Sequence, residues 1–478
     1  MDLLRALRLS GGEPPRVAFV GAGGKTSALF ELARELRPPV LVSATTHLAL
    51  EQLAYADRHL VLEASKGFSE IDDMISDGVT VVTGQPMEDG RTSGVDSAVL
   101  KHLFALAESQ WIPLLVEADG SRERPLKAPG SHEPPIPDFA NLVVVVAGLS
   151  GLDKPLEPGW VHRPERFAEL TGLSPGDRIG PDAIANVLVH PEGGLKNIPS
   201  RARRVVLLNQ ASTPNLQAQA QSIAGRIFAV QDHMASEGWM FPGFSSVLVA
   251  NLKRPGEKGR FFENHSREYV SSGSSATPPL VSAVHERVAG VVLAGGSSSR
   301  LGQPKQLLPW RGQPLVRTVA QVAVRAGLSQ VIIVTGSFAK EVKKAVQGLP
   351  VTVVQNPDWA SGQSTSLRTG LRAIHLGTGG VIFLLADQPQ VPVTLLRALV
   401  DIHAETLAPI VAPTAGGRRA NPVLFDQATF EDLSSIRGDA GGRQLFARYP
   451  VTRFKWHDES ILLDVDTIED YQRLLELE

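Results

Sequence analysis

The chain of 478 residues contains no cysteine. This absence excludes disulfides, thiolate metal sites, iron–sulfur clusters and cysteine nucleophiles as the basis of its structure or chemistry. Long apolar runs are also lacking, since a run such as residues 142–149 is far shorter than the roughly 20 residues that a membrane helix needs. The N-terminus has no apolar signal segment, so we expect a cytoplasmic protein without a membrane partner.

The chain has no excess of basic charge, because 47 Lys and Arg face 50 Asp and Glu for a formal net charge of −3. Non-specific binding to nucleic acid needs a basic surface, so we expect no nucleic-acid partner. Hydrophobic residues make up 43% of the chain and charged residues 20%, which are ordinary values for a globular protein. Fibrous and wholly disordered structures are therefore excluded.

Short β-branched runs alternate with helical patterns in both halves of the chain, which is typical of parallel βαβ architecture. The polar segment 253–286 contains SSGSSATPP and has the composition of a linker. We therefore predict two Rossmann-like α/β domains of three layers each, at residues 1–252 and 287–478. The predicted strands are residues 16–20, 40–44, 80–83, 113–117, 142–147, 204–209, 288–294, 330–335, 351–355, 381–386, 409–412 and 422–425.

The first domain opens with a strand, a glycine cluster and a helix, in the sequence RVAFVGAGGKTSALFELARE. Glycines let backbone N–H groups turn toward an anion, and the N-terminus of the next helix adds positive charge. We predict that Lys25 contacts a phosphate there and that Thr26 holds Mg²⁺. The P-loop pattern is only partly met, because Phe19 stands where that pattern has glycine. The alternative is a strand–helix turn with an incidental lysine.

Two acidic residues follow a later apolar strand of the same domain. Glu117 and Asp119 stand at the carboxyl end of that strand, where ligands bind in open α/β sheets and where a P-loop protein keeps its metal-holding acid. The alternative is that one of the two caps the turn at Gly120. The predicted nucleotide-binding residues of this domain are Gly21, Gly23, Gly24, Lys25, Thr26, Glu117 and Asp119.

Weaker signals accompany this site. The segment VVLLNQAS stands where a guanine-reading loop would lie, but Gln210 and Ser212 depart from the Asn-Lys-x-Asp pattern and argue against guanine specificity. His47, His132 and His162 are candidates for a metal ligand or a general base, although a lone histidine is more often structural.

These segments resemble the YqeC-like accessory proteins of selenium-dependent molybdenum hydroxylases. The resemblance covers about residues 10–250 and is carried by GAGGKT, TTH, EADGSRERPLKAPGSHEPPIP, VVAGLSGLDKPL and VHRPE. It implies a P-loop-like nucleotide-binding domain that acts in the maturation of a molybdenum hydroxylase. ATP and GTP are the candidate nucleotides of this domain, and the hydroxylase apoenzyme is a candidate partner. It implies no particular reaction.

The second domain opens with a richer loop, in the sequence VAGVVLAGGSSSRLGQPKQLLPWRGQPLV. Glycine and serine let backbone N–H groups surround a triphosphate, while Arg300 and Lys305 neutralise charge on the α-phosphate and the leaving pyrophosphate. This spacing predicts transfer of a nucleotidyl group. The predicted nucleotide-binding residues are Leu293, Ala294, Gly295, Gly296, Ser297, Ser298, Ser299, Arg300 and Lys305.

Acidic residues later in this domain complete a predicted metal site. Asp387 follows an apolar strand, where one carboxylate can hold Mg²⁺ against the phosphates. Asp464 and Asp466, in the sequence LLDVDTIEDY, are predicted to supply the second carboxylate. The alternative for Asp466 is the N-cap of the helix that follows it. Arg300, Lys305 and Asp387 are the predicted catalytic residues.

The acceptor side of this site is predicted from glycine turns with polar residues. Ser364 and Ser366 lie in NPDWASGQSTSLRTGL, at the entry to a helix, where they either donate hydrogen bonds to substrate or only cap the helix. Asn421, in NPVLF, is a further predicted substrate-binding residue. Arg418 and Arg419 are candidates to contact an anionic acceptor. The alternative is that both are solvated surface residues.

Residues 288–476 resemble the molybdenum cofactor cytidylyltransferases and their GT-A-like nucleotidyltransferase relatives, through LAGGSSSRLGQPKQLLP, ADQP, NPVLF, GDAGGR and DVDT in that order. The resemblance implies Mg²⁺-dependent transfer of CMP from CTP to the phosphate of the molybdopterin-bound molybdenum cofactor. Gly295 is a departure, because the cytidylyl enzymes usually have alanine there and the guanylyl enzymes glycine. PKQLLP and ADQP are more like the cytidylyl branch.

The combined prediction is a cofactor cytidylyltransferase fused to a nucleotide-binding accessory domain. The alternatives are guanylyl transfer to the same cofactor, nucleotidyl transfer to a sugar phosphate or methylerythritol phosphate, and a non-catalytic cofactor carrier or chaperone whose nucleotide sites only switch its affinity for a hydroxylase.

Overall fold

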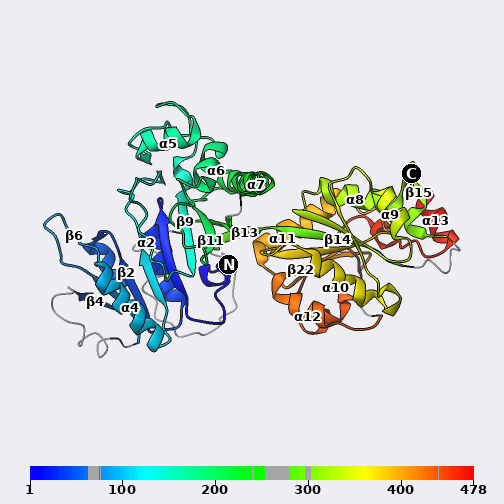
Figure 1. Ribbon diagram of the computed structural model, residues 1–478, viewed down its shortest axis with the longest axis horizontal. Helices are drawn as coiled ribbons and strands as arrows, with labels where there is room; N and C mark the ends of the chain where they lie inside the picture. Colours follow the sequence, from blue (N-terminus) through cyan, green and yellow to red (C-terminus); the bar gives the residue numbers. More distant parts are fainter. Residues whose placement is uncertain are drawn as a thin grey trace. The chain divides into compact units, whose positions relative to one another are not determined.

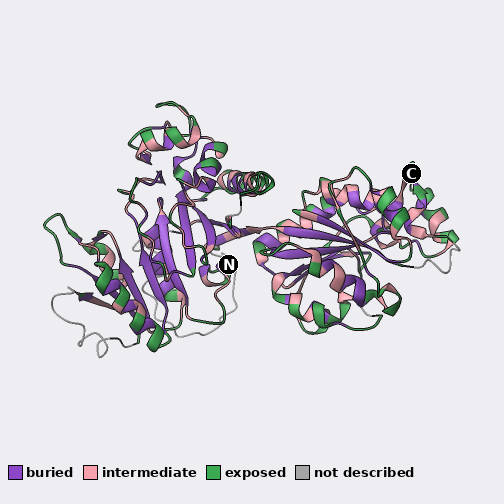
Figure 2. Ribbon diagram, in the orientation of Figure 1, coloured by how far each residue is buried: buried purple, intermediate pink, exposed green. Residues whose placement is uncertain are grey.

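The computed structural model describes residues 1–62, 75, 77–239, 242–252, 279–296, 303–439 and 441–477. Contacts divide the chain into two compact units, Met1–His285 and Glu286–Glu478, and each unit is an α/β structure (Figure 1). Buried residues concentrate in the strands of both central sheets, while the outward sides of the helices are exposed (Figure 2). Within the described residues, no helix is both long and apolar enough to cross a membrane.

The first unit is built on a nine-stranded sheet with the order β13-β12-β11-β9-β1-β7-β2-β5-β4. The strand pairs from β4 through β12 are parallel, so their carboxyl ends share one edge of the sheet. β1 lies between β9 and β7, which places the loop after β1 beside the ends of both strands. The strands are β1 Arg16–Gly21, β2 Val40–Ala44, β4 Arg58–Val61, β5 Val79–Thr83, β7 Leu114–Glu117, β9 Leu142–Gly148, β11 Arg203–Asn209, β12 Ser246–Ala250 and β13 Val281–Glu286.

Helices of the first unit begin where the sequence supplies caps. The Asp96 side chain accepts from the N–H of Val99 at the start of α4, and Thr213 caps α7 just before Pro214. The α-helices are α1 Leu3–Ala6, α2 Lys25–Glu35, α4 Ser97–Ser109, α5 Pro164–Thr171, α6 Pro181–Val189 and α7 Pro214–Ser236, and the 3₁₀ turns are η1 Leu50–Tyr55 and η3 Leu149–Gly151. Two small ribbons pair β3 Leu48–Ala49 with β6 Arg91–Thr92 and β8 Leu126–Lys127 with β10 Val161–His162.

Every predicted strand of the first half has a counterpart in this sheet. The predicted linker, however, is wrong at its C-terminal end. Residues Val281–Glu286 form β13 on the sheet edge, although they belong to the segment 253–286 predicted as a linker. Only every third residue of β13 is buried, so its sequence lacks the continuous apolar run of an inner strand. Residues 253–278 lie outside the described residues.

The second unit has a sheet with the order β18-β17-β14-β19-β22-β20-β21, and β23 pairs with β20. β18, β17, β14 and β19 are parallel, whereas β22 is antiparallel to both of its neighbours. The strands are β14 Val288–Ala294, β15 Pro309–Trp310, β16 Gln313–Pro314, β17 Gln330–Thr335, β18 Thr352–Gln355, β19 Gly380–Leu385, β20 Ile410–Ala415, β21 Arg418–Arg419, β22 Val423–Asp426 and β23 Val451–Lys455.

Alternate residues of the inner strands face two separate hydrophobic cores, so the second unit has three layers. Val292 and Ile333 pack with residues of α8 and α11, whereas Val291 and Ile332 pack with residues of α10 and α12. The helices are α8 Leu315–Arg325, α9 Ala339–Ala345, α10 Gln363–Ala373, α11 Val393–Thr406, α12 Phe430–Ser435 and α13 Ile468–Leu475. The 3₁₀ turns are η4 Lys305–Leu307, η5 Trp359–Ser361, η6 Gln427–Thr429, η7 Gly442–Ala447 and η8 Glu459–Leu462.

Candidate functional site

The second unit carries a cleft of about 760 Å³ at the carboxyl ends of β14 and β19. The segment after β14 forms one wall, the start of α10 another, and acidic residues line the rest. The lining residues are Leu293, Ala294, Gly295, Gly296, Lys305, Gln306, Trp359, Ala360, Ser361, Gly362, Gln363, Ser366, Leu385, Ala386, Asp387, Asp439, Asp464 and Asp466.

Lys305 joins two of the acids across this cleft. Its ammonium donates to the carboxylate of Asp387 and, at 2.7 Å, to Oδ1 of Asp466. Burial alone would lower the pKa of Lys305, but the two carboxylates outweigh it and raise the pKa. The backbone N–H of Val465 donates to the carbonyl of Asp387 at 3.4 Å, which ties the two acidic segments together.

Asp464 stands beside this pair and receives a hydrogen bond from the Gln388 amide. Partial burial, followed by repulsion from Asp387, raises the pKa of Asp464 to about 6. Three carboxylates thus lie near one ammonium group that pairs with two of them, an excess of negative charge that favours binding of a further cation.

The alternative that Asp466 caps the following helix is wrong. Thr467 is the N-cap of α13, since its hydroxyl accepts from the N–H of Asp470 and the Asp470 carboxylate accepts from the N–H of Thr467. The side chain of Asp466 is therefore left to face Lys305.

The predicted acceptor residues do not all reach the cleft. Ser366 lines it, and its hydroxyl accepts from the Asn356 amide at 3.1 Å, whereas Ser364 is fully buried and is not a lining residue. Asn421 precedes β22 and is likewise absent from the described lining. Arg418 and Arg419 form the exposed strand β21, with the Arg419 guanidinium over the ring of Phe446. Ser297, Ser298, Ser299 and Arg300 lie outside the described residues.

Three residues in or next to this cleft were not predicted as site residues: Asp439 and Trp359, which line it, and Gln388, which contacts the lining residue Asp464. Asp439 lines the cleft and accepts from the backbone N–H of Gln363 at 3.3 Å, at the start of α10. Gln388 orients Asp464, and Trp359 contributes the aromatic wall. Signals for the first two exist in the sequence, because they belong to the motifs GDAGGR and ADQP.

The first unit brings its glycine cluster into a tight strand–helix connection. β1 ends at Gly21 and α2 begins at Lys25, with positive φ angles of 83° at Gly23 and 124° at Gly24. A Cβ atom on Gly23 would lie 2.4 Å from the backbone of Gly148, so a side chain is sterically excluded there.

Asn209, at the end of β11, holds this connection in place. Its buried amide nitrogen donates to the carbonyl of Gly23 at 2.9 Å, and its oxygen accepts from the N–H of Leu252 at 2.8 Å. Asn209 is therefore occupied with the backbone. The next residue, Gln210, accepts from the hydroxyl of Ser150 at 2.6 Å.

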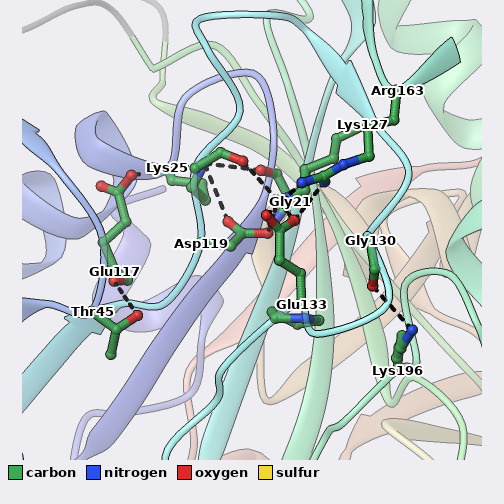
Figure 3. A network of polar contacts seen from close by, with 12 residues as sticks. Gly21, Lys25, Thr45, Glu117, Asp119, Lys127, Gly130, Glu133, Arg163 and Lys196 are labelled. Atoms are coloured by element: carbon green, nitrogen blue, oxygen red, sulfur yellow. Dashed lines mark hydrogen bonds and ion pairs between the residues drawn. The ribbon is translucent and has the colours of Figure 1, made fainter. Parts of the chain in front are cut away.

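Lys25 faces Glu117, the last residue of β7, and Asp119, which follows two residues later (Figure 3). The ammonium of Lys25 donates to the carbonyl of Gly21 at 2.9 Å and lies 3.7 Å from Glu117 and 3.4 Å from Asp119. The hydroxyl of Thr26 donates to Glu117 at 2.8 Å. Burial raises the pKa of Glu117, because the charged form loses its hydration.

Asp119 links this loop to a chain of ion pairs that begins at buried Lys127 and ends at the partly exposed Glu133 and Arg163 (Figure 3). Its Oδ2 accepts from the N–H of Gly21 at 3.0 Å and from Lys127 at 2.9 Å. Lys127 also lies 2.6 Å from Glu133, which is paired with Arg163 at 2.6 and 2.7 Å. Burial alone would raise the pKa of Glu133, but Arg163 and Lys127 lower it to about 2.

Asp119 is therefore part of an ion network rather than a cap of the turn at Gly120. The network was not predicted, because Lys127, Glu133 and Arg163 are separated from one another in sequence. The conspicuous block PLKAPGSHEPP does contain the first two.

The three candidate histidines are not gathered into one site. His47 is exposed and its Nδ1 lies 3.1 Å from the carbonyl of Thr92, and His132 is exposed. Burial, with Arg163 and Lys127 nearby, lowers the pKa of His162 to about 4. A different group, Glu286, His403 and Asp426, is the cluster of potential metal ligands within the described residues, and the last two are paired at 2.7 Å.

Comparison with known proteins assigns families to both halves. The family described as "MobA-like NTP transferase domain" matches residues 290–453, and the family described as "YqeC protein" matches residues 17–165. YqeC of Escherichia coli is 32% identical over 231 residues, which cover 48% of this chain and 87% of that protein.

Two relatives match the second half. Nicotine blue oxidoreductase of Paenarthrobacter nicotinovorans is 35% identical over 198 residues, which cover 39% of this chain and 96% of that protein. Molybdenum cofactor cytidylyltransferase of Escherichia coli is 24% identical over 182 residues, which cover 38% of this chain and 92% of that protein.

Proposed function

The chain belongs to the YqeC family through its first half and to the MobA-like NTP transferase family through its second, and from this premise we propose a molybdenum cofactor cytidylyltransferase. In this proposal the second unit transfers CMP from CTP to the phosphate of the molybdopterin-bound cofactor and releases pyrophosphate. The first unit is a nucleotide-binding accessory unit that acts in the maturation of a molybdenum hydroxylase, whose apoenzyme is the proposed protein partner.

The observation that carries this proposal is the position of Lys305 between Asp387 and Asp466 in a wide polar cleft. A lysine held there can contact the phosphates of a nucleotide, and the carboxylates suit a hard divalent cation such as Mg²⁺. The raised pKa of Asp464 supports the same site, because a cation would relieve the repulsion between these acids.

In the proposed reaction, an oxygen of the cofactor phosphate attacks the α-phosphorus of CTP and the bond to the β-phosphate oxygen breaks. Pyrophosphate leaves with the electron pair, so no covalent enzyme intermediate is needed. Asp387 and Asp466 would hold Mg²⁺, which supplies charge neutralisation for the phosphates when bound. Lys305 and the loop at Gly295 and Gly296 would position the triphosphate, and Arg300 would neutralise further charge.

The choice of base is the finer part of the proposal. CTP is favoured by the motifs PKQLLP and ADQP and by the relative named as a cytidylyltransferase. Gly295 favours GTP, and a relative named as a molybdenum cofactor guanylyltransferase from Serratia proteamaculans is 32% identical over 142 residues. Guanylyl transfer is therefore the second candidate.

The test is incubation of the full chain with Mg²⁺ and α-³²P-labelled CTP or GTP, with and without isolated molybdenum cofactor. Cofactor-dependent transfer of label from CTP supports the proposal, and transfer only from GTP moves the chain to the guanylyl branch. Transfer only to a sugar phosphate or methylerythritol phosphate acceptor would replace the cofactor as substrate. If label is transferred to none of these acceptors, the nucleotidyltransferase role is contradicted. Two functions then remain, a non-catalytic cofactor carrier and the oxidoreductase activity in the name of the nicotine blue relative.

A further inference from the structure

Residues 121–124 form a tight turn of the first unit. Asp119, two residues before this turn, holds it beside the glycine connection. Asp119 accepts from the N–H of Gly21 at 3.0 Å, which fixes the chain at the end of β1. The chain then folds back, with the N–H of Arg124 donating to the carbonyl of Ser121 at 3.0 Å. The turn 121–124 therefore begins two residues after Asp119, which contacts the glycine connection directly.

The residue after the turn returns to the same loop. The carbonyl of Pro125 accepts from the N–H of Gly148 at 2.8 Å. A Cβ atom built on Gly23 would lie only 2.7 Å from that carbonyl oxygen, so the backbone of Pro125 is packed directly on the loop. Both ends of the turn are thus anchored at the glycine connection, which fixes the backbone of residues 121–124 next to it.

The ions already present around this connection balance one another. Lys25 contacts two carboxylates, Lys127 contacts two, and Arg163 contacts one. The network holds three cations, Lys25, Lys127 and Arg163, and three carboxylates, Glu117, Asp119 and Glu133. A triphosphate brings several additional negative charges, so binding it calls for cations that these carboxylates do not already neutralise.

Arg122 and Arg124 are such cations. Neither guanidinium forms a hydrogen bond or ion pair within the part of the chain that the structure describes, and Arg122 is exposed. Arg122 and Glu123 have positive φ angles of 48° and 61°, a conformation that costs energy for residues other than glycine and is often retained at functional sites. The turn therefore presents two unpaired arginines beside the loop.

The side of the loop on which they lie indicates which phosphate they reach. Thr26 and Glu117 are the residues suited to a divalent cation. Thr26, in the first turn of α2, donates to Glu117, the last residue of β7, and the turn 121–124 follows the same strand. A cation held by such a pair would neutralise charge on the outer phosphates of a bound nucleotide. The turn is thus on the side of the terminal phosphate.

We propose that Arg122 and Arg124 bind the terminal phosphate of a nucleoside triphosphate held at Lys25, so that the first unit selects triphosphates over diphosphates. The planar guanidinium group forms paired hydrogen bonds with phosphate oxygens, which suits this role. This inference rests on the proposed nucleotide binding by the first unit.

The test is isothermal titration of the full chain with Mg²⁺ and either a non-hydrolysable triphosphate analogue, of ATP or of GTP, or the matching diphosphate. The component that Lys25→Ala removes reports the first unit alone. In the double variant Arg122→Ala and Arg124→Ala, affinity for the analogue should fall about 10- to 100-fold, as expected for lost hydrogen bonds to a charged group, while diphosphate affinity stays unchanged. The corresponding double lysine variant should retain part of the preference.

Arg201 supplies a matched control, because it is exposed and lies at the opposite, amino end of the sheet, just before β11. Arg201→Ala should change neither affinity. An equal loss for triphosphate and diphosphate, or no loss at all, would overturn the role of the two arginines while leaving nucleotide binding intact. If the wild-type chain shows no Lys25-dependent binding of either analogue, the proposed nucleotide site itself is wrong, and the arginine clamp falls with it.

Discussion

Both units place a lysine against two carboxylates near the carboxyl ends of parallel strands, but the two sites differ in how far solvent reaches the lysine. The side chain of Lys25 is 3% exposed and sits in a closed network of buried ions. The side chain of Lys305 is 22% exposed and faces a cleft of about 760 Å³. We infer that the second site has room for a nucleotide and an acceptor together, whereas the first must rearrange its own ion pairs to admit a phosphate.

The largest expected effect is on the open site. Asp387→Asn keeps the shape of the side chain but removes a charge that would hold Mg²⁺, so turnover of labelled CTP should fall by a factor on the order of 10² or more. Glu469→Gln, an exposed carboxylate on α13, is the control and should retain full turnover. Near-normal turnover of Asp387→Asn at limiting Mg²⁺ would remove this residue from the mechanism.

At the closed site of the first unit, a substitution should change the affinity for nucleotide. Lys25→Ala removes the ammonium that faces Glu117 and Asp119, and we expect nucleoside triphosphate affinity of the first unit to fall by about 10-fold or more, since a hydrogen bond to a charged group is lost. Lys101→Ala, an exposed lysine on α4, is the matched control in the titration. Equal affinities for the two variants would mean that Lys25 is structural, and the comparison between the units would fail.

Substitutions at Asp466 and at its neighbour Thr467 should have different effects, one on turnover and the other on the stability of α13. Asp466→Asn should weaken Mg²⁺-dependent turnover, because Asp466 faces Lys305. Thr467→Ala removes the cap of α13 and should lower the free energy of unfolding by about 1 kcal/mol with little change in turnover. Melting temperature and turnover measured on both variants give the answer, and the opposite assignment of effects would refute the metal role of Asp466.

Base choice should depend on the small space beside Gly295. A Cβ atom there would lie 3.1 Å from the hydroxyl of Ser366, which is itself held by Asn356. Gly295→Ala should therefore reshape this wall, and in competition between CTP and GTP we expect a shift toward CTP of up to about tenfold, roughly 1.4 kcal/mol. An unchanged ratio would show that the base is selected elsewhere.

The smallest expected effect concerns acid stability of the first unit. The pKa of Glu133 is about 2 in the folded chain and 4.5 without its partners, so its contribution to stability is present above pH 4.5 and is lost as the pH falls toward 2. Glu133→Gln should show a smaller decrease in the free energy of unfolding between about pH 5 and about pH 3 than the wild type. Denaturant unfolding at the two pH values measures this, and parallel losses would contradict the ion-pair account.

Most of the buried strands were predictable because their sequences are continuous apolar, β-branched runs, but β12, with the fully buried sequence SVLVA, was missed. Val40–Ala44, Val288–Ala294 and Gln330–Thr335 are predicted to the residue. β4 and β23, with the sequences RHLV and VTRFK, were missed because they lie at or near sheet edges and are only partly buried. A half-solvated strand has no apolar run to reveal it.

Some contacts of the candidate sites could likewise be predicted from the sequence, and others could not. Lys25, Thr26, Glu117 and Asp119 were predictable as neighbours, because carboxyl ends of adjacent parallel strands meet at one edge. The contact of Asn209 with Gly23 spans 186 residues and depends on β11 lying two strands from β1, which single-sequence patterns do not encode. The pairing of Arg163 with Glu133 likewise depends on how β10 packs beside β8.

The most direct test of the central claim is mass spectrometry of the molybdenum cofactor after incubation with the full chain, CTP and Mg²⁺. We predict that the cofactor gains one CMP in the wild-type reaction, with equimolar release of pyrophosphate, and that Asp387→Asn yields little or none of this product. A cofactor of unchanged mass under conditions in which both substrates bind would contradict nucleotidyl transfer by the second unit.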